Sequence, residues 1–261
     1  MPATQPVFFL AHGSPMNALE NNYFTRDWQQ LQQNCPVPAA IVVFSAHWHV
    51  PGTRITASPR PETIHDFSGF PPALYQQQYP APGDPALATA IATHLQQQGF
   101  PCTLDTHWGL DHGSWVMLKR LYPAADIPVL QISMDSQQHD LHWHYQLAQT
   151  LSPLRDQGIL FIGSGNIVHN IRKWMLSAAD DPIDWARDFD REVANAIVER
   201  DLQTLFNYQT LPYANEAVPT VEHYLPLIYC MGLSNSGDHL QFSDFGFEDL
   251  STACSRSVRW G

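Results

Sequence analysis

Short apolar runs alternate with longer amphipathic segments along this chain. The runs 6–11 and 39–46 are rich in β-branched and aromatic residues, and each stops at an alanine followed by a histidine, which is typical of a buried strand. Helices are expected where a cap precedes a periodic segment that ends at glycine, as between Asp84-Pro85 and Gly99. Further strands are expected over 101–105, 127–133, 159–163, 239–243 and 255–260, and helices over 86–98, 112–121, 138–156, 181–199 and 221–231.

This alternation predicts an α/β protein with a central, mostly parallel (mixed) sheet and helices on both faces. No charge run, Gly/Ser linker or shift of composition marks a boundary in the 261 residues, so we expect a single domain over 1–261. The cysteines are far apart and form no Cys-x-x-Cys pair, which favours small core residues over a disulfide framework or a zinc ribbon. They are Cys35, Cys102, Cys230 and Cys254.

Charge and composition exclude several classes of partner. The formal charge of −12, from 25 acidic and 13 basic residues, repels phosphate-rich molecules, so nucleic acid is not expected as a partner. No stretch is long enough to span a membrane, and no basic leader precedes the first strand, so a cytoplasmic protein is expected. Prolines gather in connections such as 70–72 and 79–83; such long ordered loops are usually functional, and we expect a substrate wall there.

Histidines at the ends of the strand-like runs predict a metal site. His12 and His47 each end a run, and His169 follows the run 159–163 at one remove. In open α/β sheets ligands bind outside the carboxyl ends of the strands, and neutral imidazole is the commonest metal-ligating side chain. Two alternatives stay open here: His12 could be a satisfied histidine at a strand end, and the stretch 163–166 could cradle a phosphate, although it lacks the lysine of a P-loop.

The remaining histidines have weaker cases. His223, beside Glu222, is weak by spacing alone, and neighbours on a helix point about 100° apart, so the two can hardly ligate one metal. His49 could pair with His47 as in a His-x-His site, but the following Pro51-Gly52 favours His47 alone. A solvated face is expected for His139, His142 and His144, a pocket position is open for His65 and His107, and no context supports His94 or His239.

Seven ordered segments over nearly the whole chain resemble the class III extradiol ring-cleaving dioxygenases, specifically the DOPA 4,5-dioxygenase branch. Such a series is far more specific than any single motif. It includes Ser45-Ala46-His47-Trp48 and Glu222-His223-Tyr224-Leu225-Pro226. The full set is 12–15, 45–48, 63–71, 79–83, 108–113, 165–170 and 222–226.

The resemblance implies one divalent metal ion held by His12, His47 and His223. It places His169 close by, as an acid–base residue or a fourth ligand, and His112 on the substrate side as a second catalytic residue. The familiar mononuclear iron site uses two histidines and one carboxylate, whereas here the third position is a histidine. An all-nitrogen set suits zinc as readily as iron, so we expect Fe(II) for oxygenase activity and Zn(II) as an occupant of the purified protein.

The chemistry implied is the opening of a catechol ring with O₂, with DOPA cleaved at its 4,5 bond or a related small catechol as substrate. Two rivals remain at this point. A zinc-dependent hydrolase would use the same histidines to lower the pKa of a bound water. A non-enzymatic metal-binding protein would explain the histidines but not the long loop from His65 to Gly83. A monomer or small homo-oligomer is expected.

Overall fold

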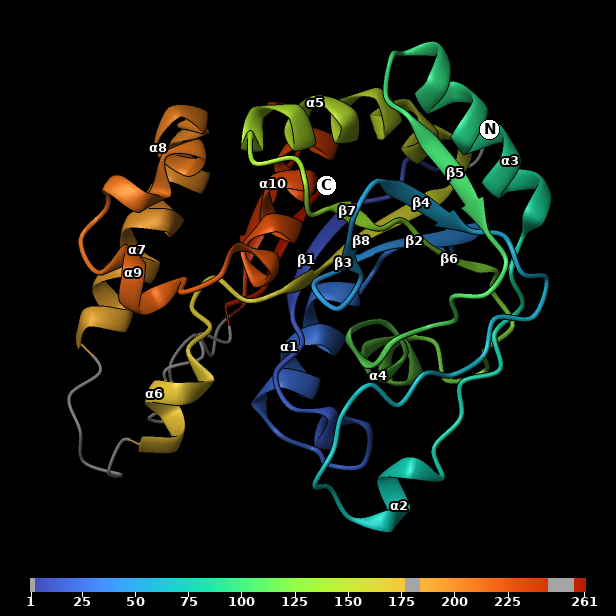
Figure 1. Cartoon of the computed structure of the whole chain (residues 1–261), viewed down its shortest axis with the longest axis horizontal. Coiled ribbons are helices and arrows are strands. Elements are labelled where there is room, and N and C mark those ends of the chain that lie inside the picture. Colours follow the sequence, from blue (N-terminus) through green and yellow to red (C-terminus); the bar gives the residue numbers. More distant parts are fainter. Residues whose placement is uncertain (1–2, 177–183, 244–255) are drawn as a thin grey trace.

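A six-stranded mixed sheet lies at the centre of the computed structural model, which describes residues 3–176, 184–243 and 256–261 (Figure 1). Its strand order is β6-β2-β8-β1-β10-β9, and the first four run parallel. Strand β10 pairs antiparallel with both β1 and β9. The bounds are β1 Val7–Ala11, β2 Ala40–Ser45, β6 Val129–Gln131, β8 Ile159–Gly165, β9 Leu240–Phe242 and β10 Val258–Trp260.

The central strands are buried on both faces, which explains why they are continuous apolar runs rather than alternating ones. Every residue of β1, β2 and β8 is buried. Successive side chains point to opposite faces: Phe8 and Val43 join one apolar cluster, while Phe9 and Phe44 join the other. The sheet therefore separates two hydrophobic cores.

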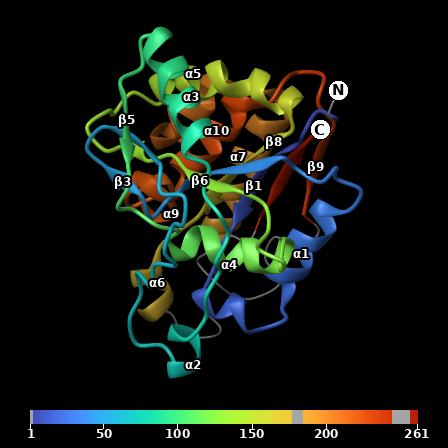
Figure 2. The ribbon, with the colours of Figure 1, turned by 90° about the vertical axis from the view of Figure 1, so that its right-hand side faces the viewer.

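Helices cover both faces, as Figures 1 and 2 show. One face packs against α1 (Tyr23–Gln32) and α4 (His112–Leu121). The other packs against α3 (Pro85–Gln97), α5 (Leu141–Leu151) and α10 (Leu225–Leu233), with α7 (Asp184–Glu199) completing that core. The predicted fold class is thereby confirmed.

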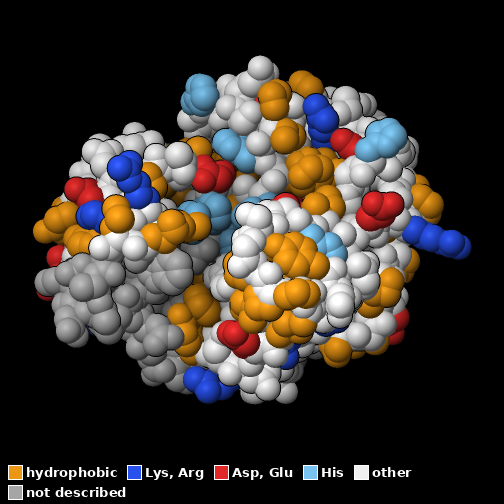
Figure 3. Space-filling model, turned by 60° about the horizontal axis from the view of Figure 1, so that its bottom comes forward, with side chains coloured by type: hydrophobic (Ala, Val, Ile, Leu, Met, Phe, Trp, Pro, Cys, Tyr) orange, Lys and Arg blue, Asp and Glu red, His pale blue; other side chains and the backbone are white. Residues whose placement is uncertain are grey.

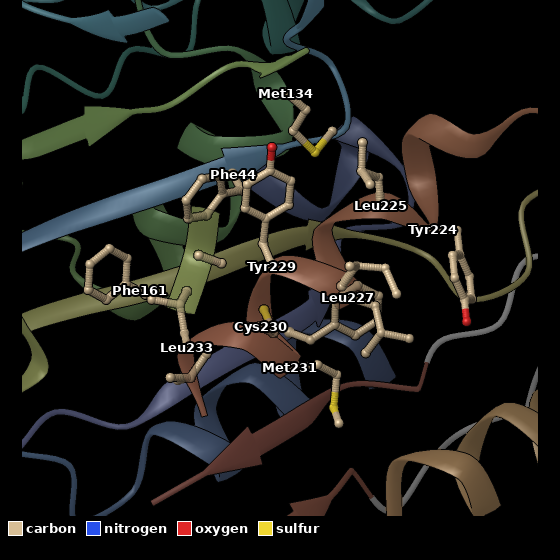
Figure 4. Packing of buried hydrophobic residues seen from close by; sticks show 14 of the residues in the cluster. Phe44, Met134, Phe161, Tyr224, Leu225, Leu227, Tyr229, Cys230, Met231 and Leu233 are labelled. Carbon is tan, nitrogen blue, oxygen red and sulfur yellow. The ribbon is translucent and has the colours of Figure 1, made fainter. Parts of the chain in front are cut away.

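Helix α10 is the most deeply buried helix of this second core. All nine of its residues are buried, as expected for a helix that is apolar all round. Figure 4 shows its side chains against β2 and β8. The ring of Tyr229 stacks on Phe44 with 4.2 Å between centroids, so this helix fixes the position of the segment that precedes it, which contains His223.

Smaller elements surround this frame. Strand β3 pairs with β7, and β4 pairs with β5. The bounds are β3 His49–Val50, β4 Thr53–Thr56, β5 Cys102–Asp105, β7 Met134–Asp135, α2 Pro72–Tyr75, α6 Ile171–Leu176, α8 Leu202–Phe206 and α9 Ala214–Ala217, with 3-10 turns at Pro15–Ala18, Ser152–Gln157, Tyr208–Thr210 and Val221–His223. No helix among the described residues combines the length and apolarity needed to cross a lipid bilayer.

Several predicted boundaries are corrected. The helix expected over 138–156 begins only at Leu141, because Asp140 caps it, and its last part is a 3-10 turn. The helix expected over 221–231 is a 3-10 turn followed by α10, and the strand expected over 127–133 is limited to β6. Among the cysteines, Cys102 and Cys230 are buried, but Cys35 is only half-buried. Cys254 and the expected helix start at 181–182 lie outside the described residues.

Candidate metal centre

The carboxyl ends of β1 and β2 deliver two histidines to one edge of the sheet. His12 follows β1 directly, and the turn behind it depends on Gly13, whose φ of 60° lies in the left-handed region. His47 follows β2, and its backbone N–H donates to the Ser45 hydroxyl at 3.2 Å. His223 reaches the same edge from the 3-10 turn before α10, and its carbonyl accepts from the Asn166 backbone at 2.9 Å.

Three ring nitrogens converge at this edge. The Nε2 atoms of His12 and His47 are 3.3 Å apart, and one nitrogen of each of His12, His47 and His223 lies within 4.8 Å of the others. The Nε2 atom of His223 is buried without a hydrogen-bond partner. A buried, unsatisfied imidazole nitrogen beside two others fits a metal ion.

The opposite nitrogen of each ring lies beside an acceptor, which favours the tautomer with the proton on Nδ1. The Ser164 hydroxyl donates to the Gly113 carbonyl at 2.5 Å and therefore accepts from His12 Nδ1 at 3.0 Å. A carboxylate oxygen lies 3.3 Å from Nδ1 of His47 and of His223, contributed by Asp66 and Glu222 respectively. With each Nδ1 carrying the proton, the Nε2 lone pairs are free for a cation.

Burial keeps these rings neutral. The pKa of His12 and of His47 lies well below the usual value because of burial and the neighbouring histidines. Burial also lowers the pKa of His223, although Glu222 opposes the shift. Neutral imidazole is the ligating form, so all three rings are ready to bind a metal at neutral pH.

His169 and His112 lie on two sides of this set. The His169 ring stacks on His223 with 3.4 Å between centroids and 9° between planes. One of its ring nitrogens lies within 4.8 Å of atoms of Glu222 and His223, in a cluster that does not include His12 or His47. His112 begins α4, with its ring centroid 3.9 Å from that of His47. Figure 3 shows histidine side chains at the surface in a hollow beside the lobe that carries α6–α9.

Comparison with known proteins places this site in a family. The family model described as the catalytic LigB subunit of aromatic ring-opening dioxygenase matches residues 6–253. The chain belongs to this family. A single metal ion is in keeping with both the family and the histidine cluster.

Relatives of established name agree with this assignment. The chain is 48% identical over 231 residues to the 4,5-DOPA dioxygenase extradiol of Escherichia coli (strain K12), a match that covers 87% of this chain and 84% of that protein. It is 39% identical over 232 residues to the protein of the same name from Beta vulgaris, covering 87% and 85%. The predicted membership of the extradiol dioxygenases, in the DOPA branch, is confirmed.

A solved structure agrees with the fold. An uncharacterized protein from Escherichia coli K12 superimposes with a TM-score of 0.83 at 39% identity, covering 98% of this chain and 100% of that one. The match therefore includes the sheet edge and the connections that carry the histidines.

The glycines before His169 serve close packing. A Cβ on Gly163 would lie 2.6 Å from the Pro226 carbonyl oxygen, and one on Gly165 would lie 2.2 Å from that of His223. These glycines let β8 pass directly against the segment that carries His223. Close packing therefore explains why glycine is needed at both positions, without the phosphate-binding role that the sequence allows for 163–166.

Most other histidines lie outside the cluster of converging rings. His49 is half-buried in β3, and His65 and His94 contact the carbonyl oxygens of Gln77 and Thr150 at 2.9 Å. His144 corrects the expected solvated face, since it is fully buried between Tyr229 and the Gln138 carbonyl. His107, His139, His142 and His239 are exposed.

Sequence reasoning did not single out Asp66 or Ser164, which orient two of the converging rings. Asp66 lies in the long connection between β4 and α2, where no periodicity indicates which way a side chain points. Its position next to His65 in a proline-rich loop was the available signal. The sequence indicates Glu222 only as a rival ligand, whereas in the structure its carboxylate lies at Nδ1 of His223.

Proposed function

We propose that this chain is a metal-dependent extradiol dioxygenase that opens the ring of DOPA at the 4,5 bond, or that of a related small catechol, with O₂. The convergence of three histidine ring nitrogens, with His169 and His112 on either side, carries the proposal. The names of its relatives, 4,5-DOPA dioxygenase extradiol, support it. A cytoplasmic location and a monomer or small homo-oligomer stay predictions.

His12, His47 and His223 would hold the metal ion, and His169 is more distant from the first two. We propose Fe(II) for the oxygenase reaction, with Zn(II) able to occupy the same nitrogen set. When bound, the metal would supply a Lewis-acidic centre with open positions for a chelating diol and for O₂. Three protein ligands leave those positions free.

His169 would take a hydroxyl proton from the substrate and return it later. Burial and His223 lower the pKa of His169 to about 3, so its ring is neutral and can accept a proton. The Glu222 carboxylate acts in the opposite direction and favours the protonated form.

His112 would contact the substrate from the other side. The Asp66 carboxylate lies 3.0 Å from its Nδ1, and the centroid of the His112 ring lies 3.9 Å from that of His47. The ring of Phe67 packs edge-on against His112 at 5.6 Å between centroids. Phe67 belongs to the long loop after β4, so that loop supplies both an apolar surface and a carboxylate beside the site.

Oxygen uptake by protein loaded anaerobically with Fe(II) tests the proposal. DOPA and other catechols should consume O₂ and give a yellow ring-opened product, whereas tyrosine, which has a single hydroxyl, should not react, because only two adjacent hydroxyls chelate. His12→Ala should lose metal and activity, while His142→Ala, which changes an exposed histidine, should keep both. The proposal fails if iron-replete protein is inert with all catechols, and ester hydrolysis by the zinc form would then favour the hydrolase.

A further inference from the structure

Asp66 contacts two histidines of the site with one carboxylate. Its Oδ2 atom lies 3.3 Å from Nδ1 of His47, and Oδ1 lies 3.0 Å from Nδ1 of His112. Oδ1 also accepts from the backbone N–H of His112 at 2.9 Å. The side chain is only 21% exposed. One carboxylate therefore joins a proposed metal ligand to a histidine proposed to face the substrate.

Glu222 repeats this arrangement on the opposite side. Its Oε1 atom lies 3.3 Å from Nδ1 of His223 and accepts from the Thr220 hydroxyl at 2.7 Å. A ring nitrogen of His169 lies within 4.8 Å of both the carboxylate and the His223 nitrogen. Again one carboxylate stands beside a proposed ligand and a proposed acid–base residue. Only His12 differs, because its Nδ1 atom contacts the Ser164 hydroxyl.

The two carboxylates supply negative charge that the proposed ligands lack. Three imidazoles bring no negative charge to a divalent cation, and burying an uncompensated charge is costly. In the two-histidine, one-carboxylate site a ligand supplies that charge directly. Here Asp66 and Glu222 place two carboxylates against the far side of two ligand rings, where such partners raise the basicity of the ligating nitrogen and fix ring orientation.

We propose that Asp66 and Glu222 are positioning residues, which supply from outside the ligand set the negative charge and orientation that other mononuclear iron sites take from a carboxylate ligand. Each carboxylate orients one proposed metal ligand and also lies beside one neighbouring histidine. Metal affinity and turnover should therefore fall together when either carboxylate is neutralised. The part that concerns turnover rests on the proposed function, whereas the part that concerns metal affinity does not.

The test compares Asp66→Asn and Glu222→Gln with the parent protein. Affinity for Zn(II) and Co(II) is measured by competition with a chelating dye, and the Co(II) absorption spectrum reports ligand geometry. We expect each variant to bind about 10- to 100-fold more weakly, with an altered Co(II) spectrum, and to turn over more slowly even at full iron occupancy. Glu62→Gln is the matched control: it removes an exposed carboxylate from the same loop and should change none of these readouts.

The proposal is overturned if both variants bind Zn(II) and Co(II) within about twofold of the parent with unchanged spectra, since a role in loop packing alone predicts that result. If only one variant is affected, the proposal is overturned for the carboxylate whose variant is unchanged. Should Asp66→Asn fail to fold, NMR of the zinc-loaded parent decides: hydrogen-bonded Nδ1–H protons must be present on His47 and His223. Iron-loaded parent without oxygenase activity would refute the proposed function, but the affinities would still decide this inference.

Discussion

Gly113 allows the first turn of α4 to pass directly beside the histidine cluster. A Cβ at this position would lie 2.5 Å from the Ser45 hydroxyl and 3.0 Å from Cδ2 of His47. Alanine normally stabilises a helix by about 1 kcal/mol relative to glycine. At this buried position we expect overpacking to dominate, because the contacted groups are themselves hydrogen-bonded and cannot withdraw freely.

Gly113→Ala should therefore lower the free energy of unfolding by about 1–3 kcal/mol and weaken zinc binding by displacing His47. Urea unfolding and zinc competition measure the two effects. Gly237→Ala is the control, because nothing lies within 4 Å of a Cβ at that exposed glycine. A more stable Gly113→Ala variant with unchanged zinc affinity would show that the site tolerates this methyl group.

His169 should influence turnover more than metal retention. Its ring is stacked on His223 and groups with Glu222, while three other nitrogens already converge. In His169→Ala we expect metal affinity within a few-fold of the parent and turnover lower by about 10²-fold, the range of a positioned acid–base group. Steady-state oxygen uptake with metal analysis of the same sample tests this. Near-normal turnover would remove His169 from the mechanism, and loss of metal would make it a ligand.

Between elements, a buried histidine links α5 to α10. Nε2 of His144 faces the Gln138 carbonyl oxygen at 2.9 Å and must donate to it, so Nδ1 accepts from the Tyr229 hydroxyl at 2.8 Å. This arrangement requires the neutral ring. Burial is the main cause that lowers the pKa of His144 to about 4, whereas an unfolded histidine titrates at about 6.5.

Because the unfolded chain binds this proton first, stability should fall as the pH falls from about 6.5 towards 4. Between pH 7 and pH 5 the contribution of His144 is about 2 kcal/mol. His144→Gln should lose that part of the pH dependence, measured as urea unfolding at both values. His142→Gln, on the exposed side of the same helix, should retain the parent slope. Equal slopes in all three proteins would contradict the assignment.

The elements that sequence predicts best are those whose signals are local. Strands β1, β2 and β8 are buried throughout and consist mainly of apolar residues, and α3 has a cap before it and a glycine after it. Helix α1 was not predicted, although Phe24, Trp28 and Leu31 have helical spacing and Asn22 forms a capping box. Its many polar residues concealed that pattern. The short strand β4 was missed because its pairing with β5 is a tertiary contact.

The residues of the site also differ in how well local sequence signals predict them. His12 and His47 follow from strand ends, because parallel strands deliver their carboxyl ends to one edge. His223 could be chosen only by resemblance, since its place depends on how α10 packs against β8. Asp66 lies in a loop whose path is determined by contacts distant in sequence. The groups that orient the rings are therefore the least predictable part of the site.

At the scale of the whole molecule, both hydrophobic cores share one sheet. Strands β1, β2 and β8 contribute side chains to each cluster, so neither core can be exposed without disrupting strands that support the other. The proposed ligands follow β1, follow β2 and precede α10, which joins distant parts of the sequence at one point. These facts favour the predicted single domain, and they lead us to expect that metal binding stabilises the entire fold.

Removal of the metal should therefore destabilise the molecule as a unit. We expect chelator-treated and zinc-loaded proteins each to unfold in one transition, and the zinc form to gain about 2.7 kcal/mol at free zinc 100-fold above the dissociation constant. Urea unfolding followed by both fluorescence and far-UV circular dichroism measures this, because coincident curves indicate one cooperative unit. His12→Ala should abolish the zinc-dependent gain, and His142→Ala should not. Two separate transitions, of which only one responds to zinc, would show that the chain contains two units and that the metal stabilises only one of them.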